Sequence, residues 1–63
     1  MIQNAWYTPD ERKPVLGLGY ETIITIDTVG NTHDWDIESW LTAWHEGDGQ
    51  ARHTYLWTYK PFN

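Results

Sequence analysis

The stretch that decides the fold is Tyr20-Glu21-Thr22-Ile23-Ile24-Thr25-Ile26-Asp27-Thr28. Successive side chains of a strand point to opposite faces, so Ile24 and Ile26 share one face while Glu21 and Asp27 share the other. The first face is apolar or β-branched, and the second carries the charges. Such alternation in a β-branched run predicts a half-buried strand over residues 20–28, and we expect Ile24 and Ile26 to face the core.

Two further strands are predicted after this one. Gly30-Asn31 is a hairpin-turn dipeptide between β-branched neighbours, so a second strand should begin near Thr32 and run through Trp35. Residues 52–59 contain the strongly alternating run 54–59, which predicts a last strand that Pro61 ends because proline has no N–H to donate. The fold class predicted is mainly β, with residues 1–63 forming one small antiparallel three-stranded meander and an N-terminal proline-containing loop or turn.

The segment from residue 36 to residue 46 is compatible with two structures. As a helix it would begin after an Asp36 cap and end before Gly47. Its apolar residues would then form one stripe: Ile37, Trp40, Leu41 and Trp44. As a strand it would also place Trp40 and Trp44 on one face. We favour a strand that continues from Thr32 to Trp44 with a bend near residues 37–39, and keep an α+β fold with a helix at 36–46 as the alternative.

Aromatic residues must supply much of the core of this 63-residue chain, which has no cysteine for a disulfide. Five Trp, four Tyr and one Phe are present, and each large ring can bury roughly 150–250 Å². The expected core residues are Ile24, Ile26, Trp40, Trp44, Leu56 and Trp57.

The charges are unevenly distributed along the chain. The formal net charge is -5, and no Lys or Arg lies between Pro14 and Ala51. Seven acidic residues fall in that interval: Glu21, Asp27, Asp34, Asp36, Glu38, Glu46 and Asp48. So acidic a segment would repel a phosphate backbone, which disfavours direct nucleic-acid binding, but it would attract a basic protein surface.

Several other classes of function are disfavoured by the sequence. No apolar run approaches the length of a membrane span, and the first residues lack the basic and apolar parts of a signal peptide, so a cytoplasmic protein is expected. On a strand His33 points away from Asp34 and Asp36, which is poor geometry for a metal. No nucleophile elbow, phosphate loop or dinucleotide fingerprint occurs. We therefore expect no enzymatic activity, no cofactor and no metal.

Both ends of the chain carry motifs of a known family. The opening Trp6-x-x-Pro9-x-Glu11-Arg12-x-Pro14 is followed by glycines and a strand, and the close has Trp57 with Pro61 four residues later. This pattern resembles the domain of unknown function 551 family, whose small proteins are common in bacteriophages and prophages. The close lacks two residues usual in the family, a His before the Trp and a Pro two residues after it. The resemblance implies a phage or prophage origin and a small β-rich domain, and no catalytic residue carries over.

Structural roles are expected for the residues that hold the sheet and the shared ends: Trp6, Arg12, Pro14, Ile24, Ile26, Trp57 and Pro61. The predicted function is that of a phage-type inhibitor that binds a basic surface of a bacterial host protein and mimics nucleic acid. The expected contact residues are Asp34, Trp35, Asp36, Glu38, Glu46 and Asp48, with Trp35 or Trp40 as an aromatic anchor. The alternative is a homo-oligomeric or scaffold protein, such as a homodimer, that uses an aromatic face of Tyr55, Trp57 and Tyr59.

Overall fold

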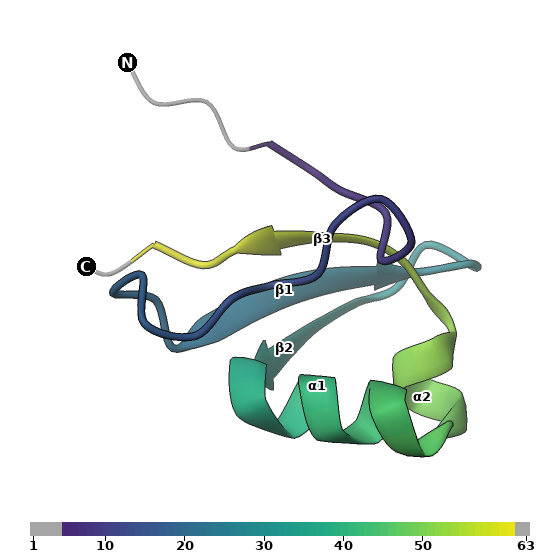
Figure 1. Ribbon diagram of the computed structural model, residues 1–63. Coiled ribbons are helices and arrows are strands. Elements are labelled where there is room, and N and C mark those ends of the chain that lie inside the picture. The colour runs from purple at the N-terminus through teal and green to yellow at the C-terminus, as the bar shows by residue number, and fades with distance from the viewer. Residues whose placement is uncertain (1–4, 62–63) are drawn as a thin grey trace.

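The computed structural model describes residues 5–61, which form a three-stranded antiparallel sheet with two short helices on one side of it (Figure 1). The elements follow one another as β1 (Thr22–Asp27), β2 (Thr32–Asp36), α1 (Ile37–Glu46), α2 (Gly49–Arg52) and β3 (Thr54–Tyr59). The prediction of a small three-stranded antiparallel domain is therefore confirmed, and the fold takes the α+β form.

The strand order in the sheet is β2-β1-β3, so β3 pairs with β1 and not with β2 as it would in a meander. Ile24 in the central strand lies opposite Asp34 of β2 and opposite Thr58 of β3, with both pairs antiparallel. The two outer strands therefore run parallel to each other. Parallel strands need a crossover connection of about a dozen or more residues, usually helical, and α1 and α2 provide it.

The prediction that the second strand continues to Trp44 is wrong, because β2 ends at Asp36 and α1 begins at the next residue. Asp36 is the N-cap, and its side chain accepts a hydrogen bond from the backbone N–H of Ser39 at 3.2 Å. Gly47 ends the helix with a φ of 81°, a left-handed conformation that glycine adopts without steric cost. These two caps favour a helix, whereas the spacing of the tryptophans fits both structures.

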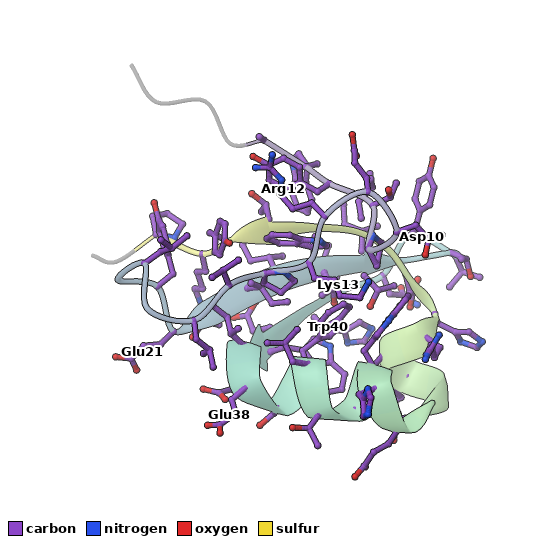
Figure 2. The ribbon with its side chains drawn as sticks, viewed as in Figure 1. Asp10, Arg12, Lys13, Glu21, Glu38 and Trp40 are labelled. Atoms are coloured by element: carbon purple, nitrogen blue, oxygen red, sulfur yellow. The ribbon has the colours of Figure 1, made fainter. Side chains whose placement is uncertain are left out.

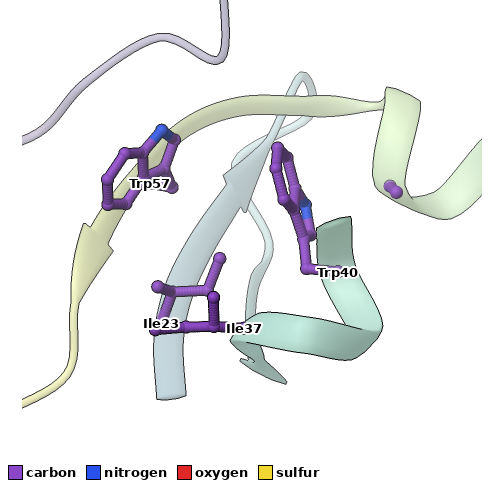
Figure 3. Packing of buried hydrophobic residues seen from close by; sticks show 5 residues of the cluster. Ile23, Ile37, Trp40 and Trp57 are labelled. Carbon is purple, nitrogen blue, oxygen red and sulfur yellow. The ribbon is translucent and has the colours of Figure 1, made fainter. Parts of the chain in front are cut away.

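The core lies between the sheet and the helices (Figure 3). Its fully buried apolar residues are Ile23, Ile37, Trp40, Ala51 and Trp57. The prediction that Trp40 and Trp57 are core residues is confirmed, and Trp44 is half-buried against them. The indole Nε1 of Trp40 donates to Thr54 Oγ1 at 3.0 Å, so this buried N–H keeps a partner.

The predicted inward face of β1 is wrong. Ile23 and Thr25 are buried beneath the helices, whereas Ile24 and Ile26 lie half-buried on the opposite face, as does Leu56 beside Ile26 on β3. Both faces of β1 carry β-branched residues, so alternation alone does not decide which face the helices cover. The charges of Glu21 and Asp27 predicted that their face of β1 would be exposed. Both residues lie at the ends of the strand, outside its buried centre, so they do not determine which face is buried.

The N-terminal segment lies along the free edge of β3. Tyr7 and Trp57 exchange two backbone hydrogen bonds of 2.9 Å as an isolated antiparallel bridge. Trp57 Nε1 also donates to the carbonyl of Arg12 at 2.8 Å, and Pro14 is buried. Structural roles were also predicted for Trp6 and Pro61. Both residues are exposed, Trp6 at 39%.

Candidate interaction site

Five exposed carboxylates form what we call the acidic surface: Glu21, Asp36, Glu38, Glu46 and Asp48. Asp36 and Glu38 lie where α1 begins, and Glu46 and Asp48 lie where it ends. A ten-residue helix is about 15 Å long, so the acids gather at two places that far apart. Figure 2 shows Glu21 and Glu38 on the α1 side of the view, whereas Arg12 lies beyond β3, where it covers the Tyr7 ring.

Two of these carboxylates also hold the helices. Asp36 caps α1, and Asp48 caps α2 by accepting from the N–H of Gln50 at 2.9 Å. Negative charge at a helix N-terminus is favourable, so both residues combine a surface charge with a structural task. Within residues 5–61 the carboxylates of Glu21, Glu38 and Glu46 make no hydrogen bond or ion pair.

The four basic side chains of the chain leave the acidic surface unneutralised. Arg12 lies over the Tyr7 ring at 4.8 Å from its centroid. Lys13 and Arg52 both lie over the Trp44 ring, at 5.6 and 4.4 Å. Among residues 5–61 Lys60 is the one of the four that forms an ion pair, with Asp34 at 2.7 Å. The fold therefore brings Lys13 and Arg52 onto α1 through Trp44, but among the described residues neither forms an ion pair with a carboxylate of the acidic surface.

The six predicted contact residues do not all lie together. Asp34 faces the sheet surface that carries Ile24, away from the helices, and is paired with Lys60. Trp35 is half-buried and packs against the core. Trp40 is fully buried, so the prediction that it serves as an exposed aromatic anchor is wrong.

The aromatic face of the alternative hypothesis is not continuous. Trp57 is fully buried, and Tyr59 is half-buried and stacks on Tyr20 at a centroid distance of 4.7 Å. Only Tyr55 of the three predicted residues is exposed, at 57%. The bulge between β1 and β3 at this point breaks the alternation, because Asp27 pairs with Thr54 while Ile26 pairs with Leu56.

A polar cavity of about 480 Å³ lies between the β1–β2 hairpin and α2, and the sequence did not predict it. It is lined by Thr25, Asp27, Asn31, His33, Asp34, Trp35, Gln50, His53 and Thr54. A turn at Gly30-Asn31 implies a register that places His33 opposite Thr25 and diagonal to Asp27. This part of the lining could therefore have been predicted from the sequence. The contribution of α2 was not, because it depends on the crossover.

Asp27 is the most strongly held carboxylate in the cavity. Its Oδ1 accepts from the N–H groups of Val29 and Asn31 at 3.0 and 2.9 Å, and its Oδ2 lies 3.4 Å from His33 Nε2. The hydrogen bond from Asn31 lowers the pKa of Asp27 below its ordinary value, with smaller contributions from Val29 and His33.

The cavity lining offers hydrogen-bonding groups and one histidine–carboxylate pair. The Asp27–His33 pair resembles a general base with its orienting carboxylate. Both hydroxyls in the lining make hydrogen bonds, since Thr25 donates to the His33 carbonyl and Thr54 accepts from Trp40. Among residues 5–61 no three His, Asp or Glu side chains are grouped to hold a metal ion. No helix in the same part of the chain is long and apolar enough to cross a membrane.

Comparison of the chain with protein-family models, with curated proteins and with solved structures finds no match. The resemblance of its two ends to the phage family stays a prediction.

Proposed function

We propose that this protein is a small non-enzymatic accessory protein that inhibits a partner protein by covering its basic surface with the acidic surface around α1. One observation carries the proposal. Within residues 5–61 Glu21, Glu38 and Glu46 are exposed and form no ion pair, and the whole chain carries a formal net charge of -5. Carboxylates that the fold itself does not neutralise create a negative potential that steers a basic partner toward them.

The partner class proposed is a protein that binds nucleic acid, because such a protein has a surface built to meet phosphates. The resemblance of the chain ends to the phage family supports a bacterial host protein, such as a defence factor, met in the bacterial cytoplasm. In this role the carboxylates take the place of phosphates, and the protein itself does not bind nucleic acid.

The proposal is tested by capture from a bacterial lysate on the immobilised protein, at low and high salt, with identification by mass spectrometry. The test variant is Glu38→Gln/Glu46→Gln, which changes only side chains without a hydrogen bond among the described residues. The control is Asp10→Asn/Glu11→Gln, which changes the net charge equally. Glu11 forms a capping box with Thr8, and glutamine is accepted at that position.

We expect a basic protein to be captured by the wild type and the control, to be captured several-fold less by the test variant, and to be released by salt because exposed charges are screened over about 8–10 Å. A partner captured equally by both variants and at high salt would contradict the proposal, and would favour contact through apolar side chains instead.

A further inference from the structure

β2 is an edge strand whose outer backbone groups have no partner among residues 5–61. In an antiparallel pair, hydrogen-bonded and non-hydrogen-bonded residue pairs alternate. Asp27 donates to the Asn31 carbonyl, and Ile37 donates to the Glu21 carbonyl, both at 2.9 Å. The ladder therefore turns the N–H and C=O groups of His33 and Trp35 toward β1.

The intervening residues of β2 turn their backbone groups away from the sheet. These groups are the N–H and C=O of Thr32 and Asp34 and the N–H of Asp36, and all three residues are exposed. An edge of this kind is a template for another strand. The carboxylates of Asp34 and Asp36 lie at alternate positions along this edge, so they favour a positively charged strand as its partner.

A second copy of this chain is a poor occupant of the edge. Two β2 strands related by a two-fold axis at Asp34 would place the Asp34 carboxylates opposite each other, and like charges directly opposite destabilise a strand pair. A strand with Lys or Arg at alternate positions would instead place a cation beside Asp34 and another beside Asp36. Asp34 already accepts a lysine in the intramolecular pair with Lys60, where both side chains are about half exposed.

The polar cavity lies along the same strand, on the side opposite to the Asp34 carboxylate. Its lining includes three consecutive β2 residues, His33, Asp34 and Trp35, together with Asp27 of β1. A strand added beside β2 would direct every second side chain toward this cavity. These are the side chains between the Lys or Arg residues that lie beside Asp34 and Asp36, so short polar side chains such as threonine would face the cavity.

We infer that β2 binds an extended basic segment of the partner protein by strand addition, so that this segment becomes a fourth strand with Lys or Arg at alternate positions. The inference rests on the proposed function and names the way in which the basic partner is held. β2 has five residues, or about 16 Å at 3.3 Å per residue, so the segment needs about five to seven residues.

The inference is tested by nuclear magnetic resonance on isotope-labelled protein with a blocked heptapeptide that alternates threonine and arginine. We expect the amides of Thr32, Asp34 and Asp36 to shift and to exchange more slowly on binding, because they gain hydrogen bonds. The amides of His33 and Trp35 already pair with β1 and should change less. The same peptide with glutamate in place of arginine should not bind.

Two matched variants separate the backbone from the charge. Asp34→Asn removes the carboxylate and keeps the outward N–H, whereas Asp34→Pro removes both and leaves the ladder to β1 intact. We expect Asp34→Pro to bind the arginine peptide about tenfold more weakly than Asp34→Asn, because it loses a hydrogen bond at the edge. Thr32→Pro against Thr32→Ala provides the same comparison at an uncharged position if Asp34→Pro does not fold.

Three results would overturn the inference. They are equal binding by the proline and asparagine variants, absence of binding at millimolar peptide, and slow exchange of the three amides in a peptide-free dimer. Lysate capture that depends on Glu38 and Glu46 but is unchanged in Asp34→Pro would overturn the inference and leave the proposed function standing. If neither the wild type nor any variant captured a basic protein from the lysate, that result would count against the proposed function alone. The peptide titration would still test strand addition, because it does not use the lysate.

Discussion

Replacing Trp40 with phenylalanine tests whether α1 is held to the sheet by this one ring. Trp40 is fully buried, donates to Thr54 Oγ1 at 3.0 Å and stacks on Trp44 with centroids 5.1 Å apart. Trp40→Phe loses the hydrogen bond, worth roughly 1 kcal/mol. It also loses buried ring carbon and leaves a small void, together worth roughly 1.5 kcal/mol. The expected loss in the free energy of unfolding is about 2–3 kcal/mol.

For a domain of this size a loss of 1 kcal/mol lowers Tm by about 4–8 °C, so Trp40→Phe should lower Tm by roughly 10–20 °C in a thermal melt followed by circular dichroism. Thr54→Val removes the acceptor, and the double variant should lose less than the sum of the two single losses because they share one hydrogen bond. Thr42→Ala on the exposed side of α1 is the control and should change Tm little. A Trp40→Phe variant that melts within a few degrees of the wild type would refute this packing of α1.

Three further outcomes are expected. Asp36→Ala should lower the free energy of unfolding by about 1 kcal/mol in a denaturant titration, because it removes the N-cap of α1, whereas Asp36→Ser should recover most of the loss; equal losses would contradict the cap. Because the pKa of Asp27 is lowered in the folded protein, its carboxylate should contribute stability above about pH 4 and lose that contribution as the pH falls through the folded-state pKa. Melts across this range should show a shallower acid loss for Asp27→Asn, and identical slopes would refute the role of the turn hydrogen bonds. Micromolar zinc or a chelator should leave Tm unchanged, and a rise of several degrees with zinc would point to a histidine site.

The sequence predicted the elements of this fold better than their arrangement. The alternation around Ile24 located β1, because a period of two is a local property of the chain. It did not identify the buried face, since Ile23 and Thr25 are as suited to a core as Ile24 and Ile26. That choice depends on where the crossover helices lie, which is a property of the whole chain.

Local sequence patterns also left the structure of the segment after β2 undecided. Asp36 and Gly47 carry cap signals that a helix needs, but the tryptophans at an interval of four satisfy a strand as well. The parallel relation of β2 and β3 requires a long crossover, and such crossovers are usually helical. This relation involves residues more than twenty positions apart and leaves no local pattern.

The candidate site was predictable where it depends on charge and unpredictable where it depends on packing. The absence of bases between Pro14 and Ala51 predicted an exposed acidic surface, and Glu38 and Glu46 lie exposed on α1. Whether Asp34 joins that surface depends on its strand face, and whether Trp40 is available depends on the core. Both follow from the position of the helices.

The central claim, that the acidic surface occupies the nucleic-acid-binding surface of a partner, is tested most directly by competitive elution. Proteins captured from a bacterial lysate at low salt are washed with a DNA or RNA oligonucleotide, with an uncharged polymer as the control. We expect the oligonucleotide to release the captured basic partner and the uncharged polymer not to, because phosphates and the carboxylates around Glu38 and Glu46 compete for the same cations. A partner that stays bound in excess oligonucleotide would show that the acidic surface does not occupy its nucleic-acid-binding surface.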